Sequence, residues 1–315
     1  MSKLKLTVIA PVFNEEDVIG HFHKRTRGVL NSLDGVESTI LYVVDRCSDN
    51  TLDVLRGIVA TDPNSKVIAL SSRFGHQMSL LAGIENSLDA DAIVMMDSDL
   101  QHPPELIPEL LAKFNLGCDV VYTIRSDTED SGFLRKMAGN MFYRALGRLS
   151  QVPMNANSAD FRLISSRVAQ IIATRFQEQN MFLRGLFTWV GFQQSGVEYK
   201  AEKRFAGESK YSFSRMMHLA TAGILSFSTK PLRVGIFIGV CFAGLALLLV
   251  VGAIISYFVD QSIPSGWTTL VVLMLLFGGI QLVVLGIMGA YIGGIYEEVK
   301  ARPRYIIDEE FSYHD

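Results

Sequence analysis

Two long uncharged stretches near the C-terminus constrain this chain more than any other feature. No Asp, Glu, Lys or Arg occurs in residues 234–259, and none occurs in residues 262–296. Each stretch exceeds the roughly 20 apolar residues that an α-helix needs to cross the hydrocarbon core of a bilayer. A core helix of a soluble protein rarely runs this far without a charge. We therefore expect two transmembrane helices within residues 234–296.

The charges that flank these stretches predict the orientation of the chain. Lys230 and Arg233 precede the first stretch, and three basic residues follow the second: Lys300, Arg302 and Arg304. The connecting residues 260–266 carry no Lys or Arg. The positive-inside rule then places both termini in the cytosol. The N-terminus lacks the pattern of a signal peptide, so we expect a multi-pass protein of the inner (plasma) membrane.

Charge and cysteine content give limited information about partners. The net charge of −3 indicates no particular partner, and we expect no nucleic acid among the partners. The three cysteines form no close pair, so neither a disulfide framework nor a zinc site is predicted. Basic residues do cluster just before the first apolar stretch, which favours anionic head groups or a phosphorylated substrate: Lys200, Lys203, Arg204, Lys210, Arg215, Lys230 and Arg233.

The first 130 residues alternate between strand and helix patterns. Apolar, β-rich segments are expected as strands at 4–10, 39–45, 65–70, 91–97 and 118–124, with helices at 15–33, 50–60, 76–88 and 104–116. This alternation predicts an α/β fold with a doubly wound, mostly parallel sheet and helices on both faces. Ligands bind such sheets at the carboxyl ends of the strands.

Beyond residue 130 the pattern changes. We expect a helix at about 133–149, a polar loop over 151–163, and further helical segments over 165–190. Residues 212–233 combine apolar residues at helical spacing with sparse basic ones, which fits helices at a membrane surface or a buried amphipathic helix.

Two carboxylates at the end of one apolar strand are the best candidates for a metal site. Asp97 and Asp99 are separated by one residue, so on an extended segment both point the same way, and Gln101 adds a third oxygen. Hard oxygen ligands suit Mg²⁺ or Mn²⁺, which then bridge substrate phosphates. An Asp-x-Asp triplet alone is more often a solvated turn, but here a buried strand delivers it.

Polar residues also follow two neighbouring strands. Asp45 ends the second strand, where its carboxylate is placed to accept hydrogen bonds from a base or ribose. Arg73 lies in the segment 72–77 after the third strand, where an arginine and a helix N-terminus suit an anion.

Seven segments together resemble the family 2 glycosyltransferases. They are PVFNEE, VVDRCSDNT, SSRFGHQMSLLAGI, MDSDLQHPPE, ADFRL, GESKY and LGIMGAYIGGIYEEVKARPRYI, and they span almost the whole chain in the family's order. The match is closest to the polyisoprenyl-phosphate glycosyltransferases, which include dolichol-phosphate mannose synthases and bactoprenol glucosyltransferases. The tail and the paired apolar stretches resemble the bactoprenol branch, and the resemblance implies a GT-A-type fold.

The resemblance also implies roles for particular residues. Nucleotide binding is expected at Pro11, Phe13, Glu15, Asp45 and Asp97, and metal binding at Asp97, Asp99 and Gln101. Phosphate contacts are expected at Arg125, Arg204 and Lys210, and catalytic roles at Asp99, Asp160, Arg204 and Lys210. The chain departs from the family where Val-Asp-Asp-Gly-Ser is usual. It has Val44, Asp45, Arg46 and Cys47, which puts nucleotide contacts around Arg46 in doubt.

The implied reaction is transfer of a hexose, expected to be glucose, from a nucleoside-diphosphate sugar to a polyprenyl phosphate. A UDP-sugar donor, undecaprenyl phosphate as acceptor, Mg²⁺ or Mn²⁺, the cytosolic membrane face and inversion at the anomeric carbon are expected. Asp160 is less obviously a base here, because a phosphate is already largely dianionic at neutral pH. Gly-x-x-x-Gly pairs at 235–239 and 289–293 permit close helix contact within the chain or in a homo-oligomer.

We accordingly expect four regions. A cytosolic catalytic domain covers residues 1–211, interfacial helices 212–233, two transmembrane helices 234–296, and a cytosolic tail 297–315. Two other readings stay open. A catalytically silent membrane scaffold or lipid-binding subunit would keep the same fold, with the departure at Arg46 and Cys47 in its favour. A processive polysaccharide synthase relative would usually have more spans and a Gln-x-x-Arg-Trp motif.

Overall fold

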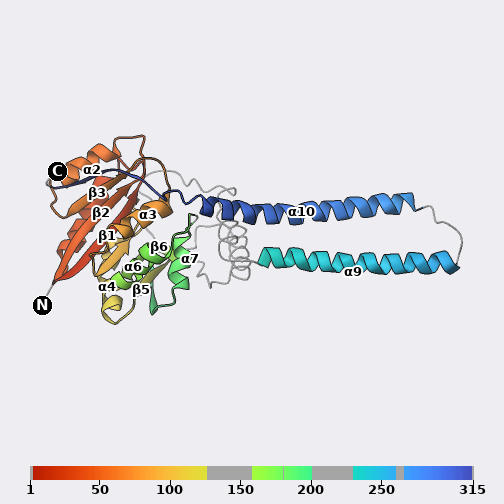
Figure 1. Cartoon of the computed structure of the whole chain (residues 1–315). Coiled ribbons are helices and arrows are strands. Elements are labelled where there is room, and N and C mark those ends of the chain that lie inside the picture. Colours follow the sequence, from red (N-terminus) through yellow and green to blue (C-terminus); the bar gives the residue numbers. More distant parts are fainter. Residues whose placement is uncertain (1–2, 126–157, 180, 201–229, 260–265, 314–315) are drawn as a thin grey trace. The chain divides into compact units, whose positions relative to one another are not determined.

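The computed structural model describes residues 3–125, 158–179, 181–200, 230–259 and 266–313 (Figure 1). The chain divides into two units. The first comprises residues 1–147, 152–215 and 302–315, and the second comprises residues 148–151 and 216–301. The first unit thus contains both ends of the chain.

The described part of the first unit is built on one eight-stranded sheet with the order β7-β5-β6-β4-β1-β2-β3-β8. The strands are β1 (Leu4–Val12), β2 (Val36–Val44), β3 (Ser65–Leu70), β4 (Ala92–Met95), β5 (Val120–Arg125), β6 (Ser158–Ser165), β7 (Gln194–Tyr199) and β8 (Ile307–Ser312). The parallel core β4-β1-β2-β3 is the one that the strand–helix alternation predicts. The whole sheet is mixed, because β6 and β8 run antiparallel to their neighbours.

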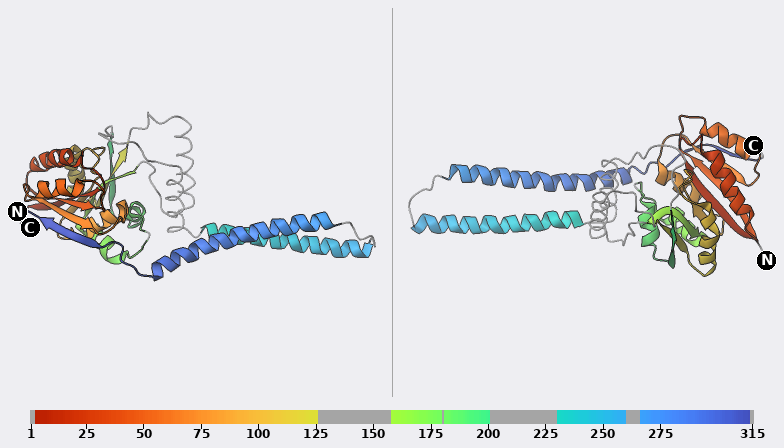
Figure 2. Two further views of the ribbon diagram at one scale, coloured as in Figure 1. Left: turned by 90° about the horizontal axis from the view of Figure 1, so that it is seen from above. Right: turned by 180° about the vertical axis from the view of Figure 1, so that it is seen from behind.

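Helices cover both faces of this sheet (Figures 1 and 2). On one face, alternate residues of β1 join a buried cluster with α1 (Ile19–Asn31), α2 (Thr51–Val59) and α4 (Ile107–Asn115), which follows the 3₁₀ turn η1 (Pro104–Leu106). The opposite face is covered by α3 (His76–Glu85), which contacts β1 and β2, and by α6 (Ser166–Arg175). The short helix α7 (Leu183–Trp189) precedes β7.

One expectation for the region after residue 150 was wrong. Residues 158–163, expected in a polar loop, belong to β6, which pairs with β4 and β5. Phe161 and Leu163 are fully buried, but Asp160 and Arg162 alternate with them and hide the strand pattern. The further helical segments expected over 165–190 are present as α6 and α7. The helix expected at 133–149 lies outside the described residues. So do residues 212–229 of the helices expected at 212–233, whereas residues 230–233 form the start of the long helix of residues 230–259.

The second unit contains two long helices, α9 (Lys230–Val259) and α10 (Trp267–Val299), which run side by side in opposite directions (Figure 1). Phe242 and Phe277 meet edge to face, with ring centroids 5.4 Å apart. Among the described residues, one segment, Leu276–Val299, is long and apolar enough to cross a membrane, and Leu232–Phe242 is a shorter apolar segment. Length and composition alone identify that candidate span.

Close packing of α3 on β1 predicts the effect of enlarging Gly83. A Cβ at this position would lie 2.4 Å from Ile9 Cγ2. We expect Gly83→Ala to destabilise the protein by about 1–3 kcal/mol through overpacking, although alanine is the better helix former by about 1 kcal/mol. Gly28→Ala in α1 is the control, because nothing lies within 4 Å of its Cβ. Thermal unfolding should show a lower Tm for Gly83→Ala and an equal or higher Tm for Gly28→Ala. Equal Tm changes would contradict the packing argument.

Candidate active site

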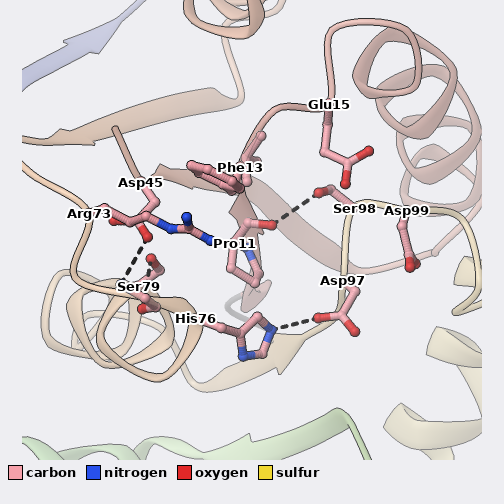
Figure 3. Close-up of a pocket in the computed structure, with 12 residues that line it drawn as sticks. Pro11, Phe13, Glu15, Asp45, Arg73, His76, Ser79, Asp97, Ser98 and Asp99 are labelled. Carbon is pink, nitrogen blue, oxygen red and sulfur yellow. Dashed lines mark hydrogen bonds and ion pairs between the residues drawn. The ribbon is translucent and has the colours of Figure 1, made fainter. Parts of the chain in front are cut away.

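A pocket opens where β1, β2 and β4 end. The parallel register aligns Val12 with Val44, and the Asp45 N–H donates to the Val12 carbonyl at 3.0 Å. From the β4 side, the Ser98 hydroxyl donates to the Pro11 carbonyl at 3.0 Å. The loops that follow the three strands and β3 therefore converge on one pocket, drawn in Figure 3 and lined by Pro11, Val12, Phe13, Glu15, Asp45, Arg73, Gly75, His76, Ser79, Asp97, Ser98 and Asp99.

The carboxylate of Asp45 holds the loop between β3 and α3. Its Oδ1 accepts a hydrogen bond from the Phe74 N–H at 2.8 Å, and its Oδ2 accepts one from the Gly75 N–H at 2.9 Å. Gly75 has a φ of 90°, a conformation in which a side chain would be strained. Asp45 is 4% exposed, so these two bonds satisfy a carboxylate that is almost wholly buried. Besides facing the pocket, Asp45 shapes its wall.

Arg73 and Phe13 form the outer part of the pocket. The Arg73 guanidinium carbon lies 4.0 Å from the centroid of the Phe13 ring, a cation–π contact between the loops that follow β3 and β1. The planar guanidinium is a good ligand for phosphate and a stacking partner for aromatic rings. Both side chains face the pocket in Figure 3.

Asp97 lies between two histidines. His76 Nε2 is 2.8 Å from Asp97 Oδ1, and the Asp97 N–H donates to His102 Nδ1 at 3.0 Å. Burial alone would raise the pKa of Asp97, but His102 and His76 outweigh it and hold that pKa well below its usual range. Burial would likewise lower the pKa of His76, but the Asp97 carboxylate raises it to about 9. At neutral pH this end of the pocket therefore contains an ion pair.

The loop after Asp97 turns sharply. Leu100 has a φ of 63°, in the left-handed region that bulky residues rarely adopt, yet its side chain is buried in the core cluster. The turn lets Asp99 Oδ1 accept the Gln101 N–H at 3.1 Å. Asp99 lines the pocket beside Asp97, whereas Gln101 is not among the pocket residues.

These residues fit a cation whose coordination is completed by a substrate. Within the described residues, no group of three or more His, Cys, Asp or Glu side chains is arranged to hold a metal ion by itself. Mg²⁺ commonly uses one or two carboxylates together with phosphate oxygens. Asp97 and Asp99 provide two carboxylates on one short loop, and the low pKa of Asp97 keeps it ionised.

Asp160 is paired with arginines. Arg184, from α7, donates to both carboxylate oxygens, with Nε 3.1 Å from Oδ1 and Nη2 2.9 Å from Oδ2. Arg162 Nη2 lies 3.7 Å from Oδ1, and its guanidinium packs 4.8 Å from the Phe187 ring centroid. Burial would raise the pKa of Asp160, but Arg184 and Arg162 lower it. An ionised, bidentate partner of an arginine is a poor proton acceptor.

The structure brings most of the expected site residues together. Pro11, Phe13, Glu15, Asp45, Asp97 and Asp99 line one pocket. Arg125 ends β5, is exposed and lies outside the pocket lining. Arg204 and Lys210 lie outside the described residues. The unusual Arg46 donates to the Ser71 carbonyl at 3.1 Å and is not among the pocket residues.

Sequence reasoning missed two contributors. His76 was noted only as part of the segment after the third strand, and its position at the carboxyl edge of the sheet is the signal that identifies it. Arg184 gave no signal, because its partner Asp160 lies 24 residues earlier in a strand that was expected to be a loop.

Comparison with known proteins identifies the family. Residues 7–175 match the model of Glycosyl transferase family 2. The chain is 38% identical over 309 residues to the uncharacterized glycosyltransferase YkcC of Bacillus subtilis, covering 98% of this chain and 94% of that protein. It is 37% identical over 304 residues to the SfII prophage-derived bactoprenol glucosyl transferase of Shigella flexneri, covering 96% and 97%. The chain therefore belongs to glycosyltransferase family 2 and is a glycosyltransferase, as the motifs predicted.

Among solved structures, the mannosyl-3-phosphoglycerate synthase of Rubrobacter xylanophilus matches with a TM-score of 0.49 and 14% identity, over 70% of this chain and 71% of that one. The mixed sheet with helices on both faces agrees with the GT-A-type fold that the resemblance to family 2 implied.

Because each carboxylate oxygen of Asp45 accepts a different backbone N–H, replacing Asp45 by the isosteric asparagine should loosen the loop that it holds. In Asp45→Asn only one oxygen remains to accept, so either the Phe74 or the Gly75 N–H loses its partner. Losing a charged acceptor costs about 1.5–3 kcal/mol, so we expect amide exchange in residues 72–78 to quicken by about tenfold or more. Hydrogen–deuterium exchange of the nucleotide-free protein measures this, with the exposed Asp89→Asn as control. Unchanged exchange would contradict the role assigned to Asp45.

The raised pKa of His76 predicts a pH-dependent contribution to stability. Because its folded pKa of about 9 exceeds the ordinary 6.5, this contribution is complete below about pH 6.5 and disappears as the pH rises through 9. The Tm difference between wild type and His76→Asn, measured without nucleotide or metal, should be larger at pH 6.5 than at pH 10. In an Asp97→Asn background the pH dependence of that difference should vanish. A difference independent of pH would contradict the ion pair.

Proposed function

We propose that this glycosyltransferase transfers a hexose, namely glucose, from a UDP-sugar to a polyprenyl phosphate such as undecaprenyl phosphate. The observation that carries the proposal is the pocket that combines Asp97 and Asp99 with the cationic Arg73 and His76. A polyanionic donor with a bridging cation suits that combination. Near full-length similarity to proteins named bactoprenol glucosyl transferase supports the lipid acceptor.

The donor is proposed to lie across the loops that follow β1, β2 and β3. Pro11, Phe13, Glu15 and Asp45 would contact the nucleoside, and Arg73 would approach its phosphates while stacked on Phe13. The bulkier Arg46, in place of the family's smaller residues, does not obstruct this arrangement, because it bonds to the Ser71 carbonyl and is not among the pocket-lining residues.

A divalent cation, Mg²⁺ or Mn²⁺, is proposed to bind at Asp97 and Asp99, with Gln101 as a further oxygen ligand. When bound, it would stabilise the negative charge that develops on the departing diphosphate. The protein's own part is to keep both carboxylates on one turn, which Leu100 fixes by its buried side chain.

The proposed transfer is a single displacement. An oxygen of the acceptor phosphate forms a bond to the anomeric carbon, the bond from that carbon to the donor diphosphate breaks, and the nucleoside diphosphate leaves with the electron pair. The anomeric configuration inverts. The acceptor phosphate has a second pKa of about 6 and needs no full deprotonation.

Asp160 is therefore proposed to act as an ionised anchor that orients Arg184 rather than as a general base. Arg125, Arg204 and Lys210 are proposed to bind phosphate, with Arg204 and Lys210 compensating the repulsion between donor and acceptor.

The acceptor's chain would stay in the bilayer, so the enzyme must work at its surface. We propose that residues 234–296 span the membrane twice, that 212–233 lie at the interface, and that the catalytic domain and both termini are cytosolic. The uncharged lengths of α9 and α10 support two spans, and Leu276–Val299 meets the criteria for a span within the described residues. The Gly-x-x-x-Gly pairs favour a homo-oligomer: Cβ atoms at Gly239, Gly289 and Gly293 would have nothing within 4 Å, whereas one at Gly235 would lie 3.7 Å from Val284.

A transfer assay with a matched pair of variants tests the proposal. Purified protein in detergent is given radiolabelled UDP-glucose, undecaprenyl phosphate and Mg²⁺ or Mn²⁺. We expect a lipid-linked product from wild type and a loss of at least about 100-fold in kcat for Asp99→Asn, because electrostatic stabilisation of the transition state is worth this much at comparable sites. Asp89→Asn, which neutralises an exposed carboxylate elsewhere, should retain wild-type activity.

Other outcomes discriminate among the alternatives. Metal-dependent UDP binding that Asp99→Asn abolishes, without transfer of glucose, would reject the sugar but keep the donor class. A product carrying many sugars would favour a processive synthase. Folded protein that neither binds UDP nor transfers sugar would overturn the proposal in favour of a scaffold.

A further inference from the structure

The segment that follows α10 in sequence is part of the sheet that carries the pocket. Strand β8 belongs to this segment and pairs antiparallel with β3; in Figure 2, β8 is the blue arrow at the edge of the sheet. Beyond the strand, the Ser71 N–H donates to the Ile306 carbonyl at 3.0 Å. Ser71 directly precedes the loop that presents Arg73 and Gly75 to the pocket. We call residues 302–312 the return segment.

The return segment also forms hydrogen bonds with the C-terminal end of α3. Arg304 Nη2 and Tyr305 Oη each donate to one oxygen of the Glu85 carboxylate. Arg304 Nη1 donates to the Phe176 carbonyl at 2.7 Å, just after α6. The Arg304 and Glu85 side chains are only 12% and 19% exposed. Burial, reinforced by Glu85, raises the pKa of Tyr305, so its hydroxyl remains a donor.

Glu85 is the last residue of α3, and His76 is the first. Between Ser71 and Glu85 lie four pocket residues: Arg73, Gly75, His76 and Ser79. We call residues 71–85 the pocket wall. The return segment thus bonds to the first and the last residue of the pocket wall, while Asp45 and Asp97 bond to its middle.

A return segment that only protected the edge of the sheet would need β8 alone. Edge strands are commonly covered in this way. The contacts of Arg304 and Tyr305 are directed at a helix on one face of the sheet. Charge-assisted hydrogen bonds at partly buried positions are about twice as strong as neutral ones. Removing Arg304 or Tyr305 would leave one oxygen of the Glu85 carboxylate without its hydrogen-bond donor, so the C-terminal end of α3 would shift toward solvent.

We propose that Arg304 and Tyr305 are positioning residues that act through Glu85 to hold the pocket wall in its donor-binding geometry. This inference rests on the proposed function for the identity of the donor. Affinity for the nucleoside diphosphate then depends on a segment more than 200 residues away from the pocket wall in sequence.

Full-length variants separate positioning from stability. Arg304→Met and Tyr305→Phe remove contacts to Glu85. Arg56→Met is the matched control, because it breaks a contact between α2 and the return segment, the 2.6 Å pair with Glu309, without touching the pocket wall. Arg302→Met is a second control, since the bond between Gln179 and Arg302 uses the main-chain carbonyl of Arg302 and would survive the change of side chain.

Two readouts are needed: hydrogen–deuterium exchange of residues 72–79 without nucleotide, and the Kd for UDP by calorimetry. We expect Arg304→Met to raise both the exchange rate and the Kd about tenfold, and Tyr305→Phe to raise them less. Both controls should keep the wild-type values, whatever their Tm. Combining Arg304→Met with Glu85→Gln should weaken UDP binding no more than the worse single change.

Variants that lose only thermal stability, and that bind UDP as tightly as wild type while folded, would overturn the proposal. The same holds if Arg56→Met raises the Kd as much as Arg304→Met. Wild type that binds no UDP contradicts the proposed function instead, and exchange in residues 72–79 then decides whether Arg304 and Tyr305 position the wall.

Discussion

Three acidic side chains lie at one edge of an apolar sheet, and the rest of the site depends on how each of them is partnered. A carboxylate that loses water on burial or partial burial needs partners that replace it. Asp45 uses two backbone N–H groups, Asp97 uses two histidines, and Asp160 uses two arginines. Each set of partners connects a strand, or the residues that follow it, to another segment of the chain, so these contacts fix the loops around the pocket.

The type of partner also suits Asp45, Asp97 and Asp160 to different roles. Backbone donors cannot move away without refolding a loop, which suits Asp45 to shaping a binding surface. The His76 contact to Asp97 is a side-chain contact at a half-exposed position, and a ligand can replace it at little structural cost. The bidentate Arg184–Asp160 pair directs a fixed positive charge toward the same region, where it lowers the pKa of Asp97.

Local patterns predicted the parallel core and most of the pocket, because these depend on short-range information. Each of the first four strands is a mainly apolar run with a polar residue within two positions of its end, and the parallel register brings these ends to one edge of the sheet. β6 was missed because its buried polar residues are compensated by α7, which lies later in the chain. No local signal indicated that Glu85, at a helix end, has partners 219 and 220 residues away.

The return segment shows why the catalytic unit is discontinuous in sequence. Without β8, the edge of β3 would expose unpaired backbone groups of an apolar strand, which favours aggregation. Covering that edge with the chain's own C-terminal residues solves this problem, and the antiparallel direction brings Arg304 and Tyr305 to the level of α3. The same residues that complete the sheet therefore reach the helix that begins at the pocket.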